Sequence, residues 1–116
     1  MNHKNLEVWK QSMELTVSIY NLSEQFPPSE TFGLTSQIRK SAISIPSNIA
    51  EGAARKGDKE FLQFLNISLG SLSELETQYL IALRLDFVNV SEKIEQQIKH
   101  VRKLIVGMRR YLISKQ

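Results

Sequence analysis

Hydrophobic residues recur along this chain at the three- and four-residue spacing of an α-helix, and no stretch alternates with the period of two that a strand requires. The pattern predicts four helices, over residues 6–25, 34–56, 58–85 and 91–114, within a single domain that covers 1–116. Short connections between such helices favour antiparallel neighbours. The predicted fold is therefore an all-α, up-down-up-down antiparallel four-helix bundle.

Prolines and glycines mark the predicted helix ends. Pro27 and Pro28 stop the first helix, and a short helical piece is expected in the following turn. Gly57 follows the second helix, where a left-handed cap favours glycine, and Asp58 is suited to cap the start of the third.

The second predicted helix contains Pro46 and Gly52, two residues that destabilise a helix interior. Proline there costs roughly 3 kcal/mol and glycine about 1 kcal/mol relative to alanine. Apolar residues keep helical spacing through the proline, which favours a continuous, kinked helix; the alternative is a break with Pro46 at the first position of a new helix. The apolar positions are Ile38, Ala42, Ile45, Ile49 and Ala53.

A polar line runs beside this apolar stripe at steps of three and four residues. It consists of Gln37, Ser41, Ser44, Asn48, Glu51 and Arg55. One interpretation is a solvated face with an ion pair between Glu51 and Arg55. The other places Asn48, Glu51 and Arg55 at a helix–helix or subunit contact, where hydrogen-bonding side chains fix register.

The third predicted helix is apolar nearly all round, which indicates that it touches neighbours on more than one face, inside the bundle or in a second subunit. One polar line interrupts it and is placed to meet the polar line of the second helix. Its members are Ser68, Ser71, Glu74 and Gln78. Glu74 and Glu76 are two residues apart and therefore point to different faces, which does not favour paired-carboxylate chemistry.

Candidate catalytic and metal-binding groups are scarce. The chain has no cysteine, its two histidines, His3 and His100, stand apart from any acidic partner, and no Glu-x-x-His pair is present. Its five glycines are isolated, so no phosphate-binding loop is expected. We therefore expect no enzymatic activity, cofactor, metal or small-molecule substrate.

The distribution of charge along the chain is the remaining indication of a binding function. The net charge is +3, and residues 91–116 hold seven basic and two acidic side chains, a local charge of +5. On the fourth predicted helix a basic flank lies away from the apolar stripe: Lys99, Arg102, Lys103, Arg109 and Arg110. Such a flank can dock RNA or DNA through phosphates, while the alternative is an ordinary soluble surface whose cations complement the helix dipole.

The first residues lead directly into an amphipathic pattern, without a signal peptide or a spanning segment. Together with the lack of cysteine, this predicts a cytoplasmic protein that does not enter the membrane.

Several motifs together resemble the 23S rRNA intervening-sequence proteins. They are Leu6-Glu7-Val8-Trp9, Phe26-Pro27, the run from Phe32 to Arg39, SIPSNIAEG at 44–52 with Arg55, Glu60-Phe61, and the run from Gly70 to Gln78. The similarity covers the first three predicted helices and is most distinctive in SIPSNIAEG. The matching signature positions, which we interpret as structural or assembly residues, are Ser44, Pro46, Asn48, Glu51, Gly52, Arg55, Glu74 and Glu76.

The resemblance implies a small bacterial four-helix bundle that assembles as a ring-like homopentamer, with no established catalytic activity. A related branch, the accessory variability determinants of diversity-generating retroelements, binds nucleic acid and a reverse transcriptase through a basic pentamer. The modest charge of this chain departs from that branch. Two hypotheses follow: a non-enzymatic, homo-oligomeric, RNA- or nucleoprotein-associated accessory, or a protein-interaction scaffold that binds no nucleic acid.

Overall fold

The computed structural model describes all residues from 1 to 116 and consists of four long helices joined by short turns. They are α1 (Glu7–Ser23), α2 (Leu34–Ala53), α3 (Asp58–Arg84) and α4 (Glu92–Ser114), with 3-10 turns η1 (His3–Asn5) and η2 (Pro28–Glu30). Each long helix begins and ends within three residues of its predicted bounds. The short helical piece expected after the first helix is η2.

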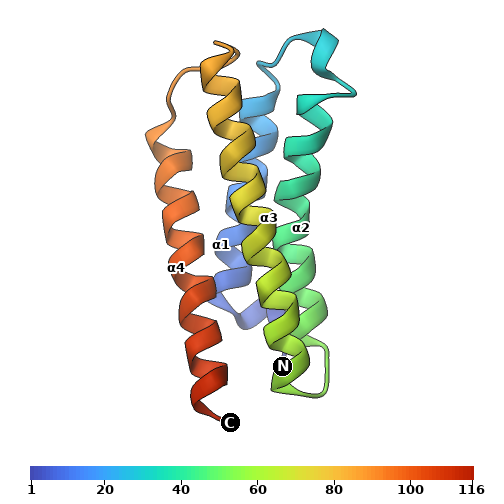
Figure 1. The fold of residues 1–116 in the computed structure, drawn as a ribbon, viewed down its shortest axis with the longest axis vertical. Helices are drawn as coiled ribbons and strands as arrows, with labels where there is room; N and C mark the ends of the chain where they lie inside the picture. Colours follow the sequence, from blue (N-terminus) through green and yellow to red (C-terminus); the bar gives the residue numbers. More distant parts are fainter.

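The helices form an up-down-up-down antiparallel bundle (Figure 1). Each helix packs against two neighbours, and the first and last helices, α1 and α4, also pack against each other. The diagonal pairs, α1 with α3 and α2 with α4, make no close backbone approach. The bundle measures 47 × 25 × 20 Å. The fold class predicted from hydrophobic spacing is confirmed.

The core follows the predicted apolar stripes. All five stripe positions of α2 are buried, and α4 buries Ile94, Ile98, Val101, Ile105 and Leu112, with Met108 half-buried at the margin. Buried apolar residues of α1 and α3, among which leucine is the commonest, complete a single cluster. Burial of such side chains contributes about 1.5–3 kcal/mol each, so these stripes determine how the helices pair.

The connection between α2 and α3 differs from the expectation. The α2 helix ends at Ala53, and Gly57 has a φ of −122°, so it is not a left-handed cap but the N-cap residue of α3. Asp58 is the first residue inside α3 rather than its cap. Its carboxylate lies near the positive end of the helix dipole and 3.2 Å from Lys115 Nζ at the end of α4.

The α2 helix continues through Pro46, as the apolar spacing predicts. Proline has no N–H for the carbonyl four residues earlier, which belongs to buried Ala42. Thr16 of α1 supplies a substitute, because its hydroxyl lies 3.1 Å from the Ala42 carbonyl oxygen and 2.8 Å from that of Ser12. A side chain of the neighbouring helix thus offsets part of the cost of the proline.

The turn between α3 and α4 is tied to the core by Tyr79, which is 1% exposed. The Tyr79 hydroxyl donates to Glu95 Oε2 at 2.8 Å and accepts from the Ser91 backbone N–H at 2.9 Å. Burial raises the pKa of Tyr79 above its ordinary value, and the Glu95 carboxylate raises it further, while the Ser91 N–H opposes the shift. Ser91 in turn caps α4 by accepting from the Ile94 N–H.

Apolar side chains also remain on the outer surface of α3. Ile67, Leu80 and Ile81 are between 42% and 50% exposed, although α3 packs against both α2 and α4. Leu85, directly after the helix, is 54% exposed. None of the four helices combines the length and the hydrophobicity that crossing a bilayer requires.

Candidate nucleic-acid interface

The polar lines of α2 and α3 meet at the interface between these helices. Ser44 Oγ lies 2.8 Å from Ser71 Oγ, and Asn48 Nδ2 donates to the carbonyl and the hydroxyl oxygens of Ser44. Buried Ser68 donates to the Ile45 carbonyl at 3.0 Å. With Gly52, these residues form what we call the α2–α3 seam: Ser44, Asn48, Gly52, Ser68 and Ser71.

At Gly52 the two helices approach each other closely. A Cβ atom at this position would lie 2.7 Å from Phe64 Cβ and 2.8 Å from Phe61 Cδ1. Both contacts are too short for any real side chain, so glycine here is a packing requirement. Contacts within the chain therefore explain why the α2 helix tolerates glycine at position 52, as they do for proline at position 46.

Glu51 and Arg55 lie at the solvent edge of this interface. They form an i, i+4 ion pair of 2.6 Å with both side chains about half exposed, as in the solvated interpretation of the polar line. The Arg55 guanidinium also lies 5.1 Å from the centre of the Phe64 ring of α3. Exposed pairs of this kind contribute only a few tenths of a kcal/mol.

A polar groove of about 390 Å³ opens above the seam. No apolar residue lines it, and its residues are Gln37, Lys40, Ser41, Ser44, Ser71, Glu74 and Gln78. Gln78 Oε1 is buried there without a hydrogen-bond partner. Lys40 and Glu74 are the only charged lining residues, so this groove carries no net charge that would favour a polyanion.

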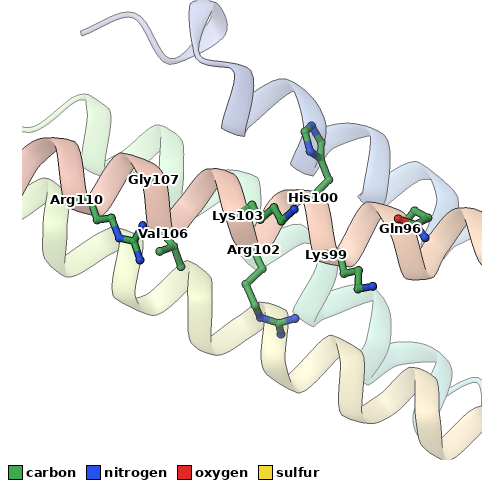
Figure 2. A pocket seen from close by; sticks show the side chains of 8 residues that line it. All are labelled: Gln96, Lys99, His100, Arg102, Lys103, Val106, Gly107 and Arg110. Atoms are coloured by element: carbon green, nitrogen blue, oxygen red, sulfur yellow. The ribbon is translucent and has the colours of Figure 1, made fainter.

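The outer side of α4 carries a second groove, of about 600 Å³. We call it the basic groove, and its lining residues, all on α4, are Gln96, Lys99, His100, Arg102, Lys103, Val106, Gly107 and Arg110 (Figure 2). Four of these are basic and none is acidic. The spacing follows from the helix itself, because residues three, four and seven apart share a face.

Arg102 is the one cation of this groove with an ionic partner. Its guanidinium lies 3.0 Å from Glu76 of α3, and both side chains are partly exposed. Glu76 therefore serves the α3–α4 contact, whereas Glu74, two residues earlier, faces α2. Lys99, Lys103 and Arg110 form no salt bridge and leave their charges available at the surface.

Arg109 differs from the other four predicted basic residues because it does not line the groove. It is half-buried, and its Nε is buried without a hydrogen-bond partner. Its position three residues before the core residue Leu112 places it near the apolar side of α4. His100, which the charge pattern alone does not single out, lines the groove instead.

No group of three or more histidine, aspartate or glutamate side chains gathers in a form that could hold a metal ion. The candidate site presents positive charge and hydrogen-bond donors at the surface of α4.

The family relationship is decided by sequence. The model of the 23S rRNA-intervening sequence proteins matches residues 4–107, nearly the whole chain. The chain belongs to this family. The match reaches into α4 as far as Gly107 and includes most of the basic groove of this 23S rRNA-intervening sequence protein.

A solved structure supports the same assignment. It is a protein described as being of unknown function from the S23 ribosomal protein family of Bacteroides thetaiotaomicron VPI-5482. The two share 26% identity with a TM-score of 0.64, and the match covers 92% of this chain and 95% of the other. No curated protein matches the sequence. These similarities establish the family and the fold of the chain.

Proposed function

We propose that this protein is a non-enzymatic, homo-oligomeric accessory factor that binds RNA or a nucleoprotein through the basic groove of α4. By resemblance to its family, the expected assembly is a pentamer in the cytoplasm. A ring would repeat the groove once per subunit and multiply its attraction for a polyanion.

One observation carries the proposal. The basic groove is lined by four cations and no acid, and three of those cations have no ionic partner within the chain. Phosphate contacts need only clustered lysine and arginine, so the groove matches a nucleic-acid backbone in charge. No phenylalanine, tyrosine or tryptophan lines it, and His100 is its one ring-bearing side chain, which favours backbone contacts over base stacking.

Binding of a fluorescently labelled RNA duplex tests the proposal directly. A triple variant, Lys99→Gln, Lys103→Gln and Arg110→Gln, is expected to bind at least about tenfold more weakly at roughly 50 mM salt, because three phosphate contacts are lost. Arg102 is kept so that its ion pair with Glu76 persists.

The matched control removes the same charge elsewhere. Lys10, Lys59 and Arg84 are exposed, lie outside both grooves and form no ion pair. Their glutamine variants should bind RNA nearly as well as the unmodified protein. Equal losses of RNA affinity in the two triple variants would show that net charge, not the basic groove, determines binding. Absence of RNA binding by the unmodified protein at this salt concentration would contradict the proposal.

A protein-interaction scaffold is the second candidate. It is favoured by the apolar side chains on the outer surface of α3 and by Phe32, which is 97% exposed at the turn before α2. Surfaces of this kind are typical of subunit or partner contacts. Light scattering at micromolar concentration tests the homo-oligomer of the first candidate, and for the second it tests whether an identical subunit covers the apolar surface of α3. A strict monomer would contradict the homo-oligomer.

A further inference from the structure

Gly107 lies within the basic groove, near the middle of α4. It is exposed, and a Cβ atom added there would meet no atom within 4 Å. Glycine in an exposed helix interior weakens the helix relative to alanine. Packing within the chain therefore gives no reason for a glycine at this position, in contrast to Gly52.

The neighbours of Gly107 indicate what the open position can do. Lys103 is four residues before it and Arg110 three residues after it, so both cations lie on the same side of the helix as the glycine. Figure 2 shows Gly107 between them along α4. Without a Cβ, a ligand can reach the helix backbone at a point with a positive charge on either side.

We propose that Gly107 is the close-approach point of the basic groove, where one phosphate of a nucleic-acid backbone lies against α4 between Lys103 and Arg110. This inference rests on the function proposed above and assigns a specific role to one residue within it. A side chain at position 107 holds the phosphate away from both cations, and electrostatic attraction weakens with distance.

The test compares three variants by duplex-RNA affinity, thermal midpoint and mass in solution. Gly107→Leu is expected to lower affinity about tenfold, the equivalent of one lost charge-assisted hydrogen bond, and Gly107→Ala by a smaller factor. Gly70→Ala is the matched control, because Gly70 is an exposed glycine inside α3, away from the groove, with equally open space around it. Both alanine variants should raise the thermal midpoint by roughly 4 °C, since alanine favours a helix.

The outcomes separate this inference from the proposed function. If the unmodified protein binds no RNA, both fail together. If it binds through Lys99, Lys103 and Arg110 but Gly107→Leu binds equally well, the role of Gly107 alone is wrong. A change in oligomeric mass in the Gly107 variants would assign the glycine to a subunit contact and would also overturn the inference.

Discussion

The α2–α3 seam and the basic groove of α4 both contain residues that helix propensity disfavours, but for different reasons. In the seam, Gly52 permits the close approach of α2 and α3. On the side of α2 that faces α1, the Ala42 carbonyl that Pro46 leaves without its usual donor accepts from Thr16. In the groove, Gly107 meets nothing, and three of four cations have no ionic partner.

This difference gives a way to separate structural from functional residues when the ligand is unknown. A costly residue with a partner inside the chain is explained by folding, and its substitution should destabilise the bundle. A costly residue without such a partner should be replaceable with no loss of stability, as we expect for both Gly70 and Gly107. Where such a residue also lies in a candidate site, as Gly107 does, it is a candidate for contact with another molecule.

The largest effect is expected at Gly52. Gly52→Ala should lower the free energy of unfolding by about 2 kcal/mol, because overpacking against Phe61 and Phe64 outweighs the gain in helix propensity. Urea denaturation measures the change. Gly70→Ala, which places the same methyl group in open space, should be at least as stable as the unmodified protein. If both variants were equally stable, the seam would not be as tightly packed as described.

Thr16→Val should have the next largest effect, about 1–2 kcal/mol, because it leaves the Ala42 carbonyl without its substitute donor. Pro46→Ala restores a backbone N–H that can reach this carbonyl. In a double-mutant cycle, Thr16→Val should therefore cost less in the Pro46→Ala background. Equal costs in the two backgrounds would show that the threonine does not compensate for the proline.

Tyr79→Phe should lower the free energy of unfolding by about 1 kcal/mol through lost hydrogen bonds to Glu95 and Ser91. Because the pKa of Tyr79 is raised in the folded state, its stabilising contribution is present below the unfolded pKa of about 10 and is lost as pH rises through the folded value.

The stability difference between the unmodified protein and Tyr79→Phe should accordingly shrink in alkaline solution above about pH 10. Chemical denaturation of both proteins between neutral and alkaline pH gives this difference directly. If the stability difference between the two proteins did not change with pH, the Tyr79 hydroxyl would not be buried and hydrogen-bonded as described.

The smallest effect is expected at Glu51. Glu51→Ala removes an exposed ion pair with Arg55 and should change the free energy of unfolding by only a few tenths of a kcal/mol. Light scattering of the same variant measures its oligomeric mass. Dissociation of an oligomer in this variant would place Glu51 at a subunit contact, the alternative that the polar line of α2 leaves open.

Hydrophobic spacing was sufficient to predict the four helices and their order in the bundle. The stripe from Ile38 to Ala53 runs unbroken through Pro46, and its burial is what keeps α2 continuous. The helix ends were harder to predict from sequence. Glycine is favoured after the end of a helix and aspartate before the start of one, and only the path of the connection shows that Gly57 is the N-cap of α3.

Contacts between helices account for what the sequence did not predict. Three such contacts depend on which residues of separate helices lie opposite one another. They are the hydrogen bond of the Thr16 hydroxyl, the close helix approach at Gly52 and the hydrogen bond from Tyr79 to Glu95. Four of the five predicted basic residues line the groove, and their role in binding stays a prediction. Arg109 is turned toward the apolar side by the helical phase, and His100 takes a place in the groove.

The salt dependence of duplex binding tests the central claim most directly. Each phosphate contact that releases a counterion contributes about 0.9 to the slope of log K against log salt concentration. The unmodified protein should therefore show a steep negative slope, and the Lys99, Lys103 and Arg110 triple variant one that is shallower by roughly 2 to 3 per bound groove. Identical slopes in the two proteins, or no binding at roughly 50 mM salt, would contradict the assignment of α4 as the nucleic-acid surface.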